Sequence, residues 1–157
     1  MSVAMTNCGP LGWYSDARGY RYVERDPLTE RPWPAMPTAF RELASSAAAA
    51  AGFESFAPDA CLVNRYEPGA RMGAHRDYDE LDLREPIVSV SIGLPAVFLW
   101  YGQRRRSTPV RVLLDDGDVL VWGRNARAGY HGVRPLAAGA HPVCGALRYN
   151  LTFRCAR

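Results

Sequence analysis

Two of the three histidines in this chain stand where they can form a metal site together with a carboxylate. His75 and Asp77 are two residues apart, and side chains two apart in an extended strand point to the same face. On a facing strand, His131 would complete the set, while Arg76 would point away. Two imidazoles and one carboxylate suit Fe(II) and leave coordination positions open for a co-substrate and oxygen. His-x-Asp occurs often by chance, so a structural histidine remains the alternative.

A second polar pattern covers residues 147–154. Alternate side chains of a strand share a face, so this segment predicts one apolar face and one polar face. The polar face carries Arg148, Asn150, Thr152 and Arg154. If it points into a barrel, its two arginines need an anion, because unpaired buried charge is costly. The protein's own carboxylates are one source; a dicarboxylate ligand is the other, although the arginines lie about 20 Å apart along a flat strand.

A strand predicted near residues 60–66 offers two more polar side chains of the same kind. Asn64 and Tyr66 would both point inward, and both can donate a hydrogen bond to a carboxylate. A structural role for an asparagine and a tyrosine in a strand is at least as common. The third histidine, His141, lies in a predicted surface turn.

The composition limits the class of protein. A chain of 157 residues, 48% hydrophobic, is long enough for one domain with its own core. All 19 basic residues are arginine, which excludes a lysine Schiff base and a P-loop lysine. The four cysteines form no CxxC pair, so we expect reduced thiols and no zinc finger. No apolar run is long enough to span a membrane, and we expect a cytoplasmic protein without an obligate protein partner, a monomer.

The sequence predicts a mainly β chain with one helix. The helix is expected over residues 38–51, with Thr38 as its cap and an apolar stripe on one side. A hairpin is expected from 11–14 and 19–23, with Trp13, Tyr20 and Tyr22 on one face; aromatic core packing is the alternative role for them. Eight further strands are expected near 60–66, 71–76, 87–92, 96–101, 110–114, 118–122, 130–133 and 146–154. Short strands with one supporting helix fit a double-stranded β-helix, or jelly roll.

Over nearly its whole length the sequence resembles the AlkB family of Fe(II)- and 2-oxoglutarate-dependent nucleic acid dealkylases. The motifs that carry the resemblance are Met5-Thr6-Asn7-Cys8-Gly9, Gly12-Trp13, Pro32-Trp33-Pro34-Ala35-Met36-Pro37, Asn64-Arg65-Tyr66, Pro68-Gly69-Ala70, His75-x-Asp77-x-Asp79-Glu80, Pro86-Ile87-Val88-Ser89-Val90-Ser91, Gly117-Asp118-Val119, Tyr130-His131-Gly132 and Arg148-Tyr149-Asn150-Leu151-Thr152-Phe153-Arg154. The last of these, together with the iron triad, is a strong family signature.

The resemblance implies a role for each residue that matches a family motif. It implies that His75, Asp77 and His131 are the iron ligands. It implies that 2-oxoglutarate is held by Arg148 and Arg154 at its two carboxylates, with Asn64, Tyr66 and Asn150 completing the pocket. It implies nucleotide recognition by Trp13, Tyr20, Arg21 and Tyr22 in a hairpin lid, with further substrate contacts from Asp79 and Arg105.

The resemblance also implies an activity and a domain plan. The activity is oxidative demethylation of 1-methyladenine and 3-methylcytosine in DNA, with RNA as a further nucleic acid substrate, releasing succinate, CO2 and formaldehyde. Residues 1–157 are expected to form a single dioxygenase domain, with the lid at about 1–30 and the jelly-roll core at about 58–157. The family carries further segments before the lid, so we expect a naturally short member or an N-terminally truncated one.

Three other functions fit part of the same pattern. The same Fe(II) oxygenase machinery can act on a protein side chain or a small molecule, although the aromatic lid and the basic residues 104–106 favour nucleic acid. A non-catalytic jelly roll that binds an organic acid would keep Arg148 and Arg154 but has no need of the metal triad. A zinc hydrolase in a cupin-like barrel ranks lowest, because no general base is evident.

Overall fold

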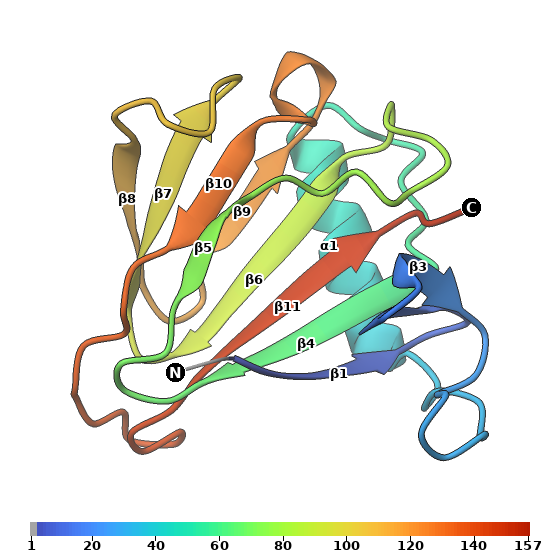
Figure 1. Cartoon of the computed structure of the whole chain (residues 1–157), viewed down its shortest axis with the longest axis horizontal. Helices are drawn as coiled ribbons and strands as arrows, with labels where there is room; N and C mark the ends of the chain where they lie inside the picture. The colour runs from blue at the N-terminus through green and yellow to red at the C-terminus, as the bar shows by residue number, and fades with distance from the viewer. Residues whose placement is uncertain (1–2) are drawn as a thin grey trace.

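The computed structural model describes residues 3–157 and consists of two antiparallel β-sheets that face each other, with one helix behind the larger sheet (Figure 1). The larger sheet has the strand order β1 (Ala4–Cys8), β4 (Ala60–Tyr66), β11 (Arg148–Arg154), β6 (Ile87–Gly93) and β9 (Val119–Trp122). The smaller has the order β5 (Met72–His75), β10 (Tyr130–Val133), β7 (Ala96–Gly102) and β8 (Val110–Leu114). This is the expected jelly-roll arrangement, and the site lies between the two sheets.

The helix α1 spans Thr38–Ala50 and packs on the outer face of the larger sheet (Figure 1). Pro37 precedes it because proline's fixed φ and missing N–H suit the start of a helix. The helix ends before Gly52, which has a φ of +86° that side chains with a Cβ rarely adopt. The prediction that Thr38 caps the helix is wrong, because Thr38 is itself the first helical residue and no side chain bonds to the free N–H groups.

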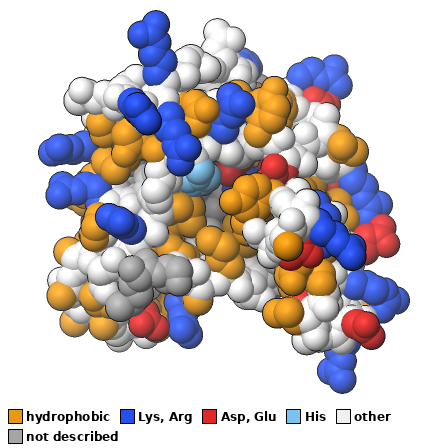
Figure 2. All heavy atoms as spheres, viewed as in Figure 1, with side chains coloured by type: hydrophobic (Ala, Val, Ile, Leu, Met, Phe, Trp, Pro, Cys, Tyr) orange, Lys and Arg blue, Asp and Glu red, His pale blue; other side chains and the backbone are white. Residues whose placement is uncertain are grey.

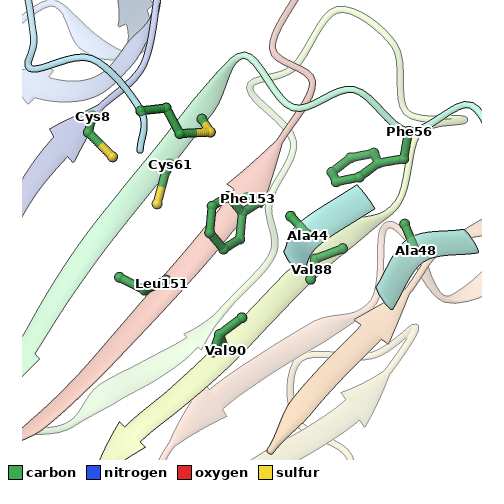
Figure 3. Packing of buried hydrophobic residues seen from close by; sticks show 10 residues of the cluster. Cys8, Ala44, Ala48, Phe56, Cys61, Val88, Val90, Leu151 and Phe153 are labelled. Atoms are coloured by element: carbon green, nitrogen blue, oxygen red, sulfur yellow. The ribbon is translucent and has the colours of Figure 1, made fainter. Parts of the chain in front are cut away.

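The core lies between α1 and the outward side chains of β6 and β11. Val88 and Val90 from β6 meet Leu151 and Phe153 from β11, and Ala44 and Ala48 of the helix cover them (Figure 3). The two alanines are fully buried, and their small side chains let the helix backbone approach the sheet closely. Because the apolar side chains of β11 point at the helix, its polar side chains must point between the sheets.

A separate two-stranded hairpin, β2 (Gly12–Asp16) and β3 (Gly19–Val23), stands at one end of the larger sheet. Its start is tied down by Asn7, whose side chain exchanges two 3.0 Å hydrogen bonds with the backbone of Trp13. The indole of Trp33 covers Gly12, where a Cβ would lie 2.3 Å from the ring. The sequence predicted the hairpin. It did not predict β1, because residues 4–8 show no regular alternation of polar and apolar side chains. Residues 1 and 2 of the expected lid lie outside the described part of the chain.

The short 3-10 helix η1 (Arg124–Ala126) joins β9 to β10, and residues 76–86 join β5 to β6 without regular structure. Both connections lie next to the site. Within residues 3–157, no helix combines the length and the apolar character needed to cross a membrane.

Candidate functional site: a cavity between the two sheets

A cavity of about 280 Å³ opens between the sheets and is lined by polar side chains from both, with aromatic residues at its mouth. Figure 2 shows the opening as a hollow with a histidine exposed in it and apolar side chains around it. Basic side chains gather along one rim, and all of them are arginine because the chain contains no lysine. The cavity is therefore accessible from the surface and is bordered by positive charge.

His75 and His131 occupy directly paired positions on the neighbouring strands β5 and β10, and their ring centroids are 4.4 Å apart. Asp77 reaches toward both, with Oδ1 3.7 Å from His75 Nε2 and Oδ2 3.8 Å from His131 Nε2. One ligand atom from each residue lies within 4.8 Å of the other two. The three residues thus present their donor atoms to one small volume that can hold a metal ion.

The geometry that brings them together differs from the one predicted. His75 is the last residue of β5, so Asp77 is not the i+2 neighbour of His75 on a strand but belongs to the irregular segment 76–86. Arg76 is exposed and its guanidinium lies over the rings of Tyr78 and Tyr130, but the residue also contributes to the lining of the cavity and so does not lie clear of the site as predicted.

The backbone fixes which nitrogen of each histidine is free. Nδ1 of His75 lies 2.9 Å from Gly73 O, and Nδ1 of His131 lies 3.1 Å from Gly129 O. A carbonyl oxygen only accepts a hydrogen bond, so each Nδ1 must carry a proton, and in the neutral ring the lone pair then lies on Nε2, which faces Asp77. Hydrogen bonds of this kind commonly orient metal-ligating histidines.

The electrostatics also suit metal ligation. Burial lowers the pKa of His131 to about 4, so its imidazole is neutral near pH 7. Burial alone would raise the pKa of Asp77, but the positive charge of Arg154 and its hydrogen bond to the carboxylate outweigh that effect and hold the pKa well below its usual range. Two imidazoles and a carboxylate are the donor set that Fe(II) takes in this class of site.

The inner face of the larger sheet carries the polar side chains predicted for it. Arg148, Asn150, Thr152 and Arg154 all point inward from β11. Asn64 and Tyr66 lie opposite Asn150 and Arg148 on β4, and Ser89 and Ser91 lie opposite Thr152 and Asn150 on β6. The strict alternation over residues 148–154 therefore predicted the orientation of this strand correctly.

Arg148 and Arg154 are both buried but differ in their partners. Arg154 donates a 2.6 Å hydrogen bond to Oδ2 of Asp77. Arg148, only 2% exposed, donates to the neutral oxygens of Leu94 and Ser91, and no acidic side chain of the described residues lies within 4.0 Å of it. Its Nε has no hydrogen-bond partner, and burial lowers the pKa of its guanidinium. A buried cation left in this state fits an anionic ligand in the cavity.

The other predicted contacts for 2-oxoglutarate line the same cavity as Arg148, and two of them are bonded to each other. Asn64 donates 3.1 Å to Oδ1 of Asn150, and Asn150 donates 2.7 Å to Ser89. Oδ1 of Asn64 is buried without a partner. Burial raises the pKa of Tyr66 to about 12, so its hydroxyl stays protonated and can donate to a carboxylate. These groups fit a dicarboxylate that enters between the sheets.

The hairpin residues divide between two faces. Trp13, Tyr20 and Tyr22 line the cavity, and Trp13 is stacked on Tyr20 with the ring centroids 5.3 Å apart. The indole N–H of Trp13 donates 2.9 Å to Asp79, which also lines the cavity. Arg21 lies on the opposite face, where it forms two hydrogen bonds to the carboxylate of Asp16.

Arg105 lies outside the cavity, at its rim. Its Nε donates 3.0 Å to the carbonyl of Ala74, the residue before His75. The guanidinium is exposed and is held next to β5. Six residues were predicted to contact substrate. Four of them line the cavity, Arg105 lies outside it next to β5, and Arg21 lies on the far face of the hairpin.

Sequence reasoning missed three residues that hold the site together. Asn7 fixes Trp13, as described above. Arg127 and Glu80 form a buried 2.9 Å ion pair close to Asp77. Glu80 was quoted within a motif, but the acidic run 77–80 gave no sign that this one carboxylate is buried, and the partner of Glu80 lies 47 residues away.

Comparison with known proteins identifies the family. The model of the 2OG-Fe(II) oxygenase superfamily matches residues 1–154. The α-ketoglutarate-dependent dioxygenase AlkB of Salmonella typhimurium is 60% identical over 98% of this chain and 71% of its own length, and that of Escherichia coli is 58% identical over the same shares. The solved structure of OsALKBH1 superimposes with a TM-score of 0.86 at 27% identity, covering 99% of this chain and 78% of that one. The chain therefore belongs to the AlkB family of the 2OG-Fe(II) oxygenase superfamily.

Proposed function

We propose that this enzyme removes N-linked methyl groups from nucleobases such as 1-methyladenine and 3-methylcytosine in DNA or RNA, releasing succinate, CO2 and formaldehyde. Such a reaction directly reverses alkylation damage. The observation that carries the proposal is the aromatic hairpin, which holds Trp13 and Tyr20 at the mouth of a cavity that ends at the two histidines. The names of relatives support it, because the human relative, 34% identical over 123 residues, is a nucleic acid dioxygenase.

In this proposal His75, Asp77 and His131 hold the iron. Bound Fe(II), with 2-oxoglutarate and O2, supplies the oxidising power that converts an N-methyl group to an N-hydroxymethyl group, which then leaves as formaldehyde. The carbonyls of Gly73 and Gly129 would hold the proton of each neutral ring on Nδ1 and leave the lone pair of Nε2 for the metal. It keeps the aspartate ionised through Arg154, whose guanidinium bonds directly to it.

The second set of residues binds the co-substrate. Arg148 would pair with the carboxylate of 2-oxoglutarate that lies far from the metal, because this buried cation has no acidic partner among the described residues. Arg154, beside Asp77, would contact the end near the metal. Asn64, Tyr66 and Asn150 offer amide and hydroxyl groups along the path between the two arginines.

The hairpin would receive the base. A base in a nucleic acid strand must leave the stack before it can reach the histidines. Stacking on an aromatic side chain contributes about 1–3 kcal/mol per base, and Trp13 and Tyr20 are placed to provide it. 1-Methyladenine and 3-methylcytosine are cationic, so the carboxylate of Asp79 beside Trp13 would favour them over neutral bases.

We also propose that the enzyme acts as a monomer in the cytoplasm. All of the residues named above come from one chain and meet in one cavity. Nucleic acid and 2-oxoglutarate are both available in that compartment.

The proposal is tested by anaerobic loading of the protein with Fe(II) and 2-oxoglutarate, followed by oxygen and a single-stranded oligonucleotide containing 1-methyladenine. We expect formaldehyde and succinate in nearly equal amounts, and neither from the Asp77→Ala variant. The same assay on methylated RNA and on the free nucleoside ranks the substrates. Succinate release without formaldehyde from any methylated nucleic acid would favour a protein or small-molecule substrate instead.

A further inference from the structure

Two carboxylates and two guanidinium groups form a largely buried network around Asp77, and three of its members, Asp77, Glu80 and Arg154, also line the cavity. The side chains of Glu80 and Arg127 are 1% and 3% exposed, and those of Arg154 and Asp77 are 7% and 12% exposed. Four buried charges are costly to desolvate, and apolar side chains of similar volume often give equal or greater stability. Stability alone therefore does not account for the network, and its connections indicate what it does.

Arg127 connects three points of the segment 76–86. It follows η1, and its Nη1 donates to the backbone carbonyl of Asp77, its Nη2 to the carboxylate of Glu80 and its Nε to the carbonyl of Glu85, each at 2.9 Å. All of the hydrogen bonds of this buried guanidinium that the structure gives thus go to one segment. They hold its beginning, middle and end.

That segment needs such support because no β-ladder provides it. Asp77 lies two residues beyond the end of β5, so no neighbouring strand fixes its backbone. Its carboxylate is held by Arg154 and its carbonyl by Arg127. Arg154 in turn lies with Nε 3.2 Å from Oε1 of Glu80. Metal ligands must be placed to within a fraction of an ångström, and here two arginines replace the missing strand pairing.

The same segment also anchors the hairpin. The hydroxyl of Tyr22 donates 2.6 Å to Oε1 of Glu80, and the indole of Trp13 donates 2.9 Å to the adjacent Asp79. Burial raises the pKa of Tyr22 above its usual range, so the hydroxyl remains a donor. The carboxylate of Glu80 thus contacts the hairpin through Tyr22 and also contacts Arg127 and Arg154, the two arginines that hold Asp77.

We propose that Arg127 and Glu80 are positioning residues: Arg127 fixes Asp77 for metal binding, and Glu80 couples the position of the hairpin to that of Asp77. Neither lies among the residues assigned to metal, co-substrate or base. Arg127 acts through Asp77, and Glu80 acts through Arg127, Arg154 and Tyr22. The part that concerns the hairpin rests on the proposed function, whereas the part that concerns Asp77 does not.

The first test measures Mn(II) affinity of the metal-free protein and needs no turnover. Arg127→Met and Glu80→Gln should each weaken Mn(II) binding by about 10- to 100-fold, the usual cost of losing a group that orients a metal ligand. Arg127→Lys should restore part of the loss. Arg124→Met is the matched control, because Arg124 lies on the same connection but donates to Gly52 and contacts Phe53.

Wild-type Mn(II) affinity in both Arg127→Met and Glu80→Gln would overturn the assignment of Asp77 positioning. Circular dichroism establishes that each variant folds. If Arg127→Met does not fold, Mn(II) affinity is measured in the near-isosteric Glu80→Gln and the charge-conserving Arg127→Lys instead. Wild-type affinity in both of these variants would overturn the proposal that Arg127 and Glu80 position Asp77.

The second test separates the hairpin from the metal. Tyr22→Phe removes only the hydroxyl that bonds to Glu80, so we expect its Mn(II) affinity to stay within about twofold of wild type. With a methylated oligonucleotide we expect several-fold more succinate per molecule of formaldehyde, because the base is held less firmly. Tyr14→Phe, on the outer face of the hairpin, is the control. An unchanged ratio in Tyr22→Phe would overturn the coupling. If no nucleic acid is demethylated at all, the proposed function and this coupling fail together, while the Mn(II) result still decides the positioning of Asp77.

Discussion

The two arginines of β11 illustrate how much the role of a residue depends on what lies beside it. Arg148 and Arg154 share a face, a strand and nearly complete burial. Arg154 is neutralised within the protein by Asp77 and Glu80. Within residues 3–157, Arg148 bonds only to a hydroxyl and a carbonyl. A buried cation with neutral partners, such as Arg148, favours binding of an anion from solution. A buried cation that is paired with carboxylates, such as Arg154, mainly orients those carboxylates.

Replacing Arg148 should therefore affect the co-substrate. We expect Arg148→Met to weaken 2-oxoglutarate binding by about 10- to 100-fold, because a hydrogen bond to a charged group contributes about 1.5–3 kcal/mol. Calorimetric titration of 2-oxoglutarate into the Mn(II)-loaded protein measures this directly. Arg111→Met, on the exposed strand β8, is the control. Wild-type affinity in Arg148→Met would show that Arg148 contacts something else.

Replacing Arg154 should affect stability more. Arg154→Met leaves the carboxylate of Asp77 without its arginine and leaves Glu80 with Arg127 alone, and breaking a buried ion pair in this way costs about 3–5 kcal/mol. Arg148→Met leaves only neutral acceptors, which costs about 1–3 kcal/mol. Urea unfolding of the metal-free proteins measures both values. A smaller loss for Arg154→Met than for Arg148→Met would contradict the difference in pairing described above.

The sequence predicted the single-residue roles unevenly, for a physical reason. The inward face of β11 was predictable because strand geometry imposes a period of two. The burial of Glu80 was not, because it depends on Arg127 and Tyr22, which are distant in sequence and reach it only in the folded chain. Asn7 was quoted within a motif, but its role was not predicted for the same reason, since its partner is the backbone of another strand.

At the scale of elements, the hairpin is a small unit held by few contacts. β2 and β3 pair only with each other, and Leu11, just before β2, forms a single bridge to Ala60. The hairpin depends on Asn7 at its start, on Trp33 at its end through a 2.9 Å bond to Val23, and on the carboxylates at 79 and 80. An element fixed at so few points can shift when a substrate enters.

Asn7→Ala should loosen this element without reaching the metal. The variant leaves a backbone N–H and a carbonyl of Trp13 unpaired, so we expect a loss of about 1–3 kcal/mol in the free energy of unfolding. We also expect a several-fold higher KM for a methylated oligonucleotide, with the KM for 2-oxoglutarate nearly unchanged. Asn125→Ala, in the exposed helix η1, is the control. Equal increases in both KM values would mean that Asn7 supports the whole site and not the hairpin alone.

The three residues of the predicted metal site do lie together, but the ends of the strands show that the argument for this clustering was incomplete. The residues were named correctly as a cluster, but the strand argument for His75 and Asp77 does not apply, since β5 ends at His75. The pairing of His75 with His131 across β5 and β10 carries the geometry instead. A period of two in a sequence does not reveal where a strand stops, and buried side chains can hold an irregular segment in its place.

At the scale of the whole molecule, the hydrophobic core and the candidate site lie on opposite faces of the larger sheet. The helix and the apolar face of the larger sheet form the main core, and the polar face of that sheet looks across the cavity at the histidines of the smaller sheet. The hairpin and the arginine-bearing rim lie around the opening (Figures 1 and 2). The net charge is +3, every charged basic residue is arginine, and on the face that Figure 2 shows several of these arginines border one side of the cavity.

This distribution predicts a salt-dependent affinity for nucleic acid. Each phosphate neutralised by an arginine on a single strand contributes about −0.7 to the slope of log affinity against log salt concentration. We expect Arg105→Ala to make that slope less steep by about 0.7, because the bond from Nε to Ala74 holds the Arg105 guanidinium at the rim. Fluorescence anisotropy of a methylated single-stranded oligonucleotide with the Mn(II)-loaded protein, from 50 to 300 mM salt, measures the slope. Arg41→Ala is the matched control, since Arg41 is exposed on α1, behind the larger sheet. Equal slopes for the wild type and Arg105→Ala would remove Arg105 from the phosphate contacts, and a loss of slope in Arg41→Ala would mean that the strand binds to the opposite side of the molecule.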